Sequence, residues 1–130
     1  MFILAVNIIL FANIINAYPV IVSDSGLNHT KNVELVNSIP DKYLKHIDTI
    51  SFINSAWAKC RIYGSHNQSI CWKGWYWAYW TKSHDCHHTK IILSSNEYDI
   101  LEHELGHVYE LCELKKDYST EEFAIDFRIK

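Results

Sequence analysis

The segment at residues 100–112, ILEHELGHVYELC, constrains the fold of this chain more than any other segment. His103 and His107 are four residues apart, so on a helix their imidazoles lie one turn apart on one face and can converge on a single ion. The apolar residues of the segment also recur at the helical period and predict one buried stripe, made of Leu101, Leu105, Val108 and Cys112. We therefore expect a helix with one face in the core and a neighbouring face at a metal site.

Glu104 directly follows the first of these histidines. A helical His-Glu-x-x-His pattern is typical of a catalytic zinc site, in which the histidines hold the ion and the glutamate is the general base for the metal-polarised water. The pattern predicts one Zn²⁺ as cofactor and hydrolysis of a protein or peptide substrate, with Glu104 as the catalytic residue. The alternative is an ordinary helix that carries two histidines by chance.

Two features in and beside this segment support a helix. Residues 94–97, SSNE, have the pattern of a capping box and predict the helix start there. Gly106 lies inside the expected helix, where glycine costs about 1 kcal/mol relative to alanine. We therefore expect another segment to pass close to the backbone at Gly106.

The whole chain has 130 residues, of which 48% are hydrophobic, and this is enough for one small core. Alternating or β-branched residues predict strands at 48–53, 56–63, 72–80 and 90–93, and a helix is expected at 30–38. These elements predict an α+β fold, with a short mixed or antiparallel sheet, the histidine helix and a C-terminal helix. We expect residues 90–93 to form an edge strand against which an extended substrate pairs its backbone.

Residues 1–17, MFILAVNIILFANIINA, are apolar, lack charged side chains and end in a small residue before Tyr18. This composition predicts a secretory signal peptide cleaved after Ala17, so that residues 18–130 form a single extracellular domain with no stable membrane insertion. An uncleaved membrane anchor would have to continue to Val22 and would bury three asparagines. A buried N-terminal element is the third possibility.

The chain has four cysteines, an even number that suits an oxidising compartment and predicts two disulfides. Three connectivities are open. We favour Cys60 with Cys71 as a hairpin staple, and Cys86 with Cys112 as a link from the histidine helix to the loop before the preceding strand.

Two histidines leave a catalytic zinc site one protein ligand short. Residues 118–127, YSTEEFAIDF, contain Ser119 and Glu122 at capping-box spacing, which predicts a second helix that opens there. If Glu122 reaches back to that cap, Glu121 is the free carboxylate and the third ligand. Glu122 itself remains an alternative, and so does Glu110, on the histidine face of the first helix.

The motif HELGH at residues 103–107, followed by EEFAIDF at 121–127, resembles the gluzincin class of zinc peptidases. The similarity is closest to the lethal-factor-like and minigluzincin-type peptidases, whose glutamate helix has the pattern Glu-x-Phe-Ala-x-x-Phe, and it covers residues 90–130. The resemblance implies a zincin-like domain with Glu121 as the third ligand. The sequence departs from the pattern because only thirteen residues separate His107 from Glu121, which demands a tight turn, and because Ile125 stands where an acidic residue often follows the ligand.

Two further stretches each allow more than one interpretation. Residues 83–88, SHDCHH, group three histidines around Cys86 and predict either an exposed loop with a disulfide or a second metal site. Residues 72–80, WKGWYWAYW, fill the core under the sheet, form a stacking surface, or do both on opposite faces.

The rival function is a secreted, disulfide-stapled binding module with a non-catalytic zinc site, whose aromatic surface is made of Trp72, Trp75, Trp77 and Trp80. Glu104 favours the enzyme, because a purely structural zinc site has no need of it. Nucleic acid is not an expected partner, since residues 97–130 carry ten acidic and only four basic side chains.

Overall fold

The computed structural model describes residues 19–54, 60–63, 68–71, 73–80 and 85–130, of which 60–63, 68–71 and 80 are described by their backbone alone. The expected signal peptide at 1–17 lies outside the described residues. Within the described part of the chain, every helix is too short or too polar to cross a lipid bilayer.

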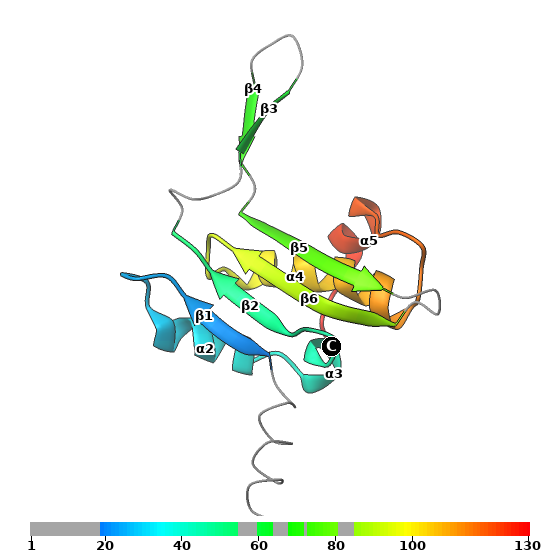
Figure 1. Cartoon of the computed structure of the whole chain (residues 1–130), viewed down its shortest axis with the longest axis horizontal. Helices are drawn as coiled ribbons and strands as arrows, with labels where there is room; N and C mark the ends of the chain where they lie inside the picture. Colours follow the sequence, from blue (N-terminus) through cyan, green and yellow to red (C-terminus); the bar gives the residue numbers. More distant parts are fainter. Residues whose placement is uncertain (1–18, 55–59, 64–67, 72, 81–84) are drawn as a thin grey trace, which may run out of the picture.

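A four-stranded mixed sheet forms the centre of an α+β fold (Figure 1). The strand order is β1 (Val20–Ser23), β2 (Thr49–Phe52), β6 (Cys86–Leu93) and β5 (Gly74–Trp80). The first three strands are parallel, whereas β5 runs antiparallel to β6 and forms one edge of the sheet.

The expected edge strand at 90–93 is the second half of β6, which lies between β2 and β5. The edge prediction is therefore wrong, and β5 is the edge strand nearest the histidine helix. The reason is visible in the burial of β6, because Ile91 and Leu93 are fully buried while paired on both sides.

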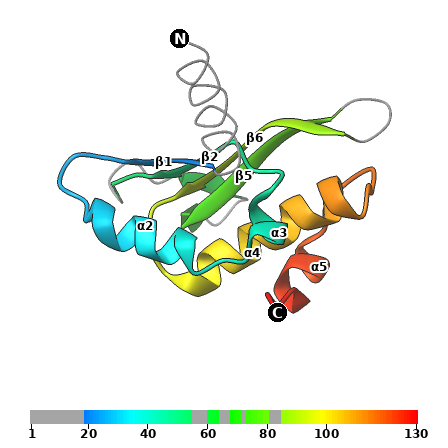
Figure 2. The ribbon, with the colours of Figure 1, turned by 90° about the horizontal axis from the view of Figure 1, so that it is seen from below.

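The helices cover one face of this sheet (Figure 2). They are α2 (His29–Asn37), α3 (Asp41–Leu44), α4 (Tyr98–Val108) and α5 (Glu121–Asp126), and α4 continues into a π-helical turn, η2 (Tyr109–Glu113). Strands β3 (Cys60–Tyr63) and β4 (Gln68–Cys71) pair antiparallel as a separate ribbon (Figure 1).

The core lies between the sheet and α4. Alternate residues of β2 and β6 point into it, and the apolar stripe expected on the histidine helix is confirmed, with exposures of at most 1%. The buried residues that β2, β6, α4 and η2 contribute to this part of the core are Ile50, Phe52, Ile91, Leu93, Leu101, Leu105, Val108 and Cys112.

Both helix starts differ from the capping-box predictions. Helix α4 begins at Tyr98 with Glu97 as N-cap and no side-chain cap, because Ser94 instead bonds the carbonyl of Lys73 at the entry to β5. Helix α5 is capped by Thr120, whose hydroxyl accepts the Phe123 N–H at 3.2 Å, one residue later than the sequence suggested.

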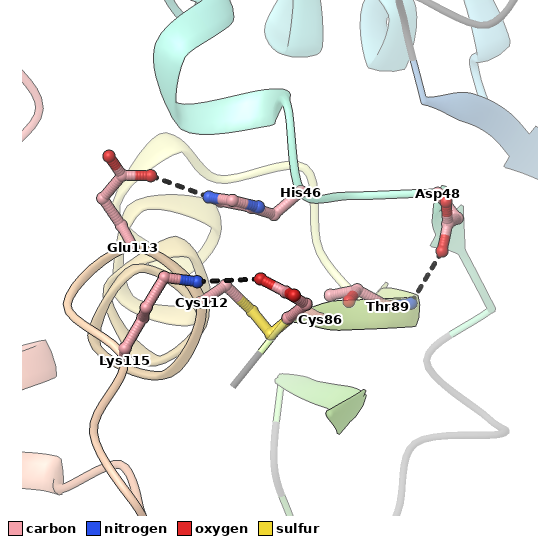
Figure 3. Close-up of a disulfide and its surroundings, with 8 residues drawn as sticks. His46, Asp48, Cys86, Thr89, Cys112, Glu113 and Lys115 are labelled. Atoms are coloured by element: carbon pink, nitrogen blue, oxygen red, sulfur yellow. Dashed lines mark hydrogen bonds and ion pairs between the residues drawn. A yellow bond between two sulfur atoms is a disulfide. The ribbon is translucent and has the colours of Figure 1, made fainter. Parts of the chain in front are cut away.

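The predicted disulfide between Cys86 and Cys112 is present, with the two Cα atoms 5.4 Å apart (Figure 3). It ties the first residue of β6 to η2, and so fixes the C-terminal end of the histidine helix against the sheet. The register of β3 and β4 places Cys60 opposite Cys71, as a hairpin staple requires, although both side chains lie outside the described part.

Candidate metal centre

The three expected metal ligands come together. Nε2 of His103 lies 3.0 Å from Oε2 of Glu121, and Nε2 of His107 lies 3.0 Å from Oε1 of the same carboxylate. The three residues form a group whose donor atoms all lie within 4.8 Å of one another. Two imidazoles and a carboxylate, supplied by α4 and α5, can therefore hold one metal ion.

The spacing of these donors suits Zn²⁺. Ligands bound to a tetrahedral zinc at about 2.0–2.1 Å stand about 3.3 Å apart, close to the 3.0 Å that separates Glu121 from each histidine. Glu121 is exposed and His103 is partly exposed, whereas the side chain of His107 is only 5% exposed. The group thus has one buried anchor and one side that faces solvent, where a water or a substrate can reach an ion.

Close packing between α4 and α5 brings Glu121 to the histidines. A Cβ built on Gly106 would lie 2.9 Å from Cβ of Phe127 and 3.1 Å from Cα of Ala124. The close passage expected at Gly106 is confirmed, and the passing segment is the glutamate helix itself. Ala124 is small enough to permit this approach.

The turn between the two helices is held by Glu110. Its buried carboxylate accepts the backbone N–H of Thr120 at 2.6 Å and the Thr120 hydroxyl at 3.2 Å. Lys115 turns the chain with a φ of 56°, and Lys116 N–H donates to the Glu110 carbonyl. Glu110 thus acts as a clamp on the N-cap of α5. Its hydrogen bonds stabilise the short connection between the histidine helix and Glu121.

Glu104 lies on α4 between the two histidines and is 6% exposed. A Cβ built on Gly74, the first residue of β5, would lie 3.1 Å from Cγ of Glu104. The missing side chain at Gly74 therefore leaves the space that the Glu104 side chain occupies. The general base expected from the sequence sits between α4 and the edge strand.

Burial dominates the electrostatics of this site. It raises the pKa of Glu104 to about 8, with a further contribution from the Glu121 carboxylate. Burial also lowers the pKa of His107, although Glu121 acts in the opposite direction. A divalent cation in the site would favour the carboxylate form of Glu104 and the neutral form of His107.

Two residues for which the sequence indicated no role at the metal site, Ser119 and Tyr76, contact His107. Nδ1 of His107 lies 3.2 Å from the hydroxyl of Ser119, which in turn is hydrogen-bonded to the hydroxyl of Tyr76. The Tyr76 ring also stacks on the imidazole, with centroids 4.8 Å apart and planes 21° apart. Tyr76 lies 31 positions before His107, and no local sequence pattern predicts a contact between them. The contact arises because β5 packs beside α4.

The other candidate ligands take no part in the group. Glu122 is exposed and lies outside it, and the carboxylate of Glu110 is bonded to Thr120. The segment SHDCHH, residues 83–88, forms no second metal site within the described chain. His87 and His88 are exposed residues of β6 that join no ligand group there, and His84 lies outside the described part.

The aromatic strand β5 divides by face, as expected for alternate residues. Tyr76 and Ala78 pack against the core, whereas Trp77 and Tyr79 are about half exposed and Trp75 is intermediate. The Trp72 and Trp80 side chains lie outside the described part of the chain.

No protein-family model, curated protein or solved structure matches the chain. The residues of the site are therefore the basis for assigning a function.

Proposed function

We propose that this protein is a secreted zinc-dependent endopeptidase with a zincin-like domain. The observation that carries the proposal is the convergence of His103, His107 and Glu121 on one point, with Glu104 beside it on the same helix. The resemblance of HELGH and EEFAIDF to gluzincins supports the same assignment. Zinc bound there would polarise a water and stabilise the oxyanion that develops on the scissile carbonyl.

The chain's own residues supply the remaining steps. A carboxylate oxygen of Glu104 accepts a proton from the attacking water and then delivers it to the leaving amine. His107, the buried anchor, and His103, the more exposed ligand, keep their Nε2 atoms toward the centre. Glu121 completes the ligand set from α5.

The edge strand β5 offers a place for an extended substrate. Its outer side pairs with no strand of the described sheet, so a peptide can add to it by backbone hydrogen bonds. Beside it is a cavity of about 330 Å³ lined by Tyr76, Trp77, Ala78, Leu111, Tyr118 and Ser119. Because Tyr76 and Ser119 also contact His107, this cavity adjoins the metal group, and it suits an apolar substrate side chain.

Secretion is supported by two independent features. Residues 1–17 have the composition of a signal peptide, and the Cys86–Cys112 disulfide is typical of an oxidising compartment.

The rival proposal is a binding module that uses the aromatic face of β5. The exposure of Trp77 and Tyr79 favours it, together with exposed Val20 and Val22 on β1. Trp77→Ala does not distinguish the two, because Trp77 also lines the proposed substrate cavity. Glu104→Gln does, since it should abolish peptide cleavage by the enzyme but leave partner binding by the module unchanged.

Metal analysis tests the ligand set. We expect about one zinc per wild-type chain, lost in Glu121→Ala and kept in Glu122→Ala, because only Glu121 belongs to the donor group. The reverse behaviour of these two variants would show that Glu122 is the ligand.

Glu104→Gln tests the chemistry. The amide keeps the shape of the side chain but cannot accept the proton, so peptide cleavage should fall by about a hundredfold or more while zinc stays bound. His103→Ala is the control, because it should lose metal and activity together. Zinc binding by a wild-type protein that cleaves no peptide library would favour the binding module.

A further inference from the structure

The two metal-binding histidines are held very differently. Nε2 of His107 faces Glu121, so the ring is a metal ligand only if its proton is on Nδ1. Nδ1 lies 3.2 Å from the Ser119 hydroxyl, and this oxygen is then the acceptor of the ring proton. The Ser119 bond therefore matches the one tautomer that leaves Nε2 free to bind an ion.

Tyr76 fixes both partners of this bond. Its hydroxyl is hydrogen-bonded to Ser119, and its ring lies nearly parallel to the imidazole of His107 at 4.8 Å. The stack opposes rotation of the imidazole, and the hydroxyl contact restricts rotation of the serine side chain. One aromatic residue of the edge strand thus holds His107 through two separate contacts.

His103 has no comparable support. Among the described residues, none bonds its Nδ1, and apart from the Glu121 contact its ring makes a T-shaped contact with His107, with centroids 4.9 Å apart. Its side chain is 29% exposed, against 5% for His107. The fixed geometry of the metal group therefore depends on His107 and on the residues that hold its imidazole in place.

We propose that Ser119 and Tyr76 are positioning residues that hold His107 as the pre-formed ligand of the metal centre. This inference rests on the proposed function, since it assumes that the group binds zinc. Residues that bond the distal nitrogen of a ligating histidine typically change metal affinity by about 10- to 100-fold. Ser119 also directly precedes the cap of α5, so its bond to Tyr76 ties the β5 edge strand to the start of the helix that carries Glu121.

The test is the zinc affinity of the purified protein, measured by competition with a chelator. We expect Ser119→Ala to bind zinc about 10- to 100-fold more weakly. Tyr76→Phe keeps the stacked ring and loses only the hydroxyl, so its loss should be smaller. Ser119→Thr keeps a hydroxyl and should restore most of the affinity.

A spectroscopic readout separates positioning from a general loss of structure. In the zinc-loaded wild type, the proton on Nδ1 of His107 should give a slowly exchanging NMR signal, which should vanish or move in Ser119→Ala and return in Ser119→Thr. Tyr118→Phe is the matched control, because it removes an exposed neighbouring hydroxyl and should change neither the affinity nor the signal.

The outcomes distinguish the two proposals. Wild-type protein without zinc affinity would overturn both. Wild-type affinity and an unchanged Nδ1 proton signal in Ser119→Ala would overturn the positioning role alone. If Ser119→Ala unfolds, a weaker zinc affinity in folded Tyr76→Phe still supports the role, and an unchanged affinity there overturns it.

Discussion

Gly106 of α4 faces Cα of Ala124 in α5 so closely that a Cβ on the glycine would stand 3.1 Å from it. The same Cβ would lie 2.9 Å from Cβ of Phe127. The distance between the two helices at this crossing sets how far Glu121 stands from the histidines. A helix of only six residues has little stability of its own, so packing at Gly106 is what places it.

Gly106→Ala should therefore weaken both the fold and the metal site. Helix propensity alone predicts a gain of about 1 kcal/mol, but overpacking against backbone and Phe127 should cost about 1–3 kcal/mol. We expect a lower unfolding midpoint in urea and a weaker zinc affinity, because α5 must move away. Ile125→Ala, on the exposed side of α5, is the control for zinc affinity. A Gly106→Ala variant that is more stable than wild type and binds zinc with normal affinity would show that the helix crossing accommodates a Cβ at this position.

Glu110 should matter for zinc binding although it is no ligand. Its carboxylate holds the cap of α5 through Thr120, so Glu110→Ala should release the start of that helix and weaken zinc binding by about tenfold or more. Titration with a metal chelator measures the change. Glu122→Ala is the matched control, since it removes an exposed carboxylate from the first turn of α5. Equal affinities for the two variants would contradict the clamp.

The convergence of His103 and His107 on one point could be predicted from the sequence, because it depends on short-range helical geometry. His103 and His107 lie on one turn, and the apolar stripe of α4 follows the same period. Cys112 lies at the end of this buried stripe, and its predicted bond to Cys86, the first residue of β6, is present. Glu121 is different: the capping argument for it assumes that Ser119 caps α5, whereas Thr120 does, so the choice of Glu121 rests on the resemblance to gluzincins.

The edge of the sheet could not be predicted, since strand order depends on pairing between distant segments. The caps failed for another reason. Adjacent Ser119 and Thr120 are both good N-cap residues, and the choice was made by tertiary contacts, with Tyr76 and His107 engaging the serine and Glu110 engaging the threonine. Such contacts leave no local pattern in the sequence.

Removal of the Cys86–Cys112 bridge should destabilise the fold markedly. The bridge joins residues 26 positions apart, and the chain between them includes most of β6 and all of α4. Loss of a native disulfide in a small domain typically costs about 2–5 kcal/mol. Urea denaturation of a double alanine variant measures the loss. An unfolding free energy within about 0.5 kcal/mol of wild type, the usual range for neutral surface changes, would contradict it.

The contact between η2 and the residues that directly follow α3 should make stability depend on pH in the acid range. Glu113 accepts hydrogen bonds from His46 at 2.7 Å and from Lys45 at 3.3 Å (Figure 3 shows the former), and these bonds lower the pKa of Glu113 below its ordinary value of 4.5. A carboxylate whose folded-state pKa is lowered stabilises the fold above its unfolded-state pKa, and this contribution disappears as pH falls through the folded-state pKa. We therefore expect Glu113→Gln to be less stable than wild type at neutral pH, by at most about 1 kcal/mol because the pair is partly exposed.

The difference should shrink as the pH falls below about 4.5, as measured by urea denaturation at several pH values. Glu122→Gln serves as the comparison, and a Glu113→Gln difference that stays constant down to acid pH would show that the bonds do not depend on the charge of Glu113.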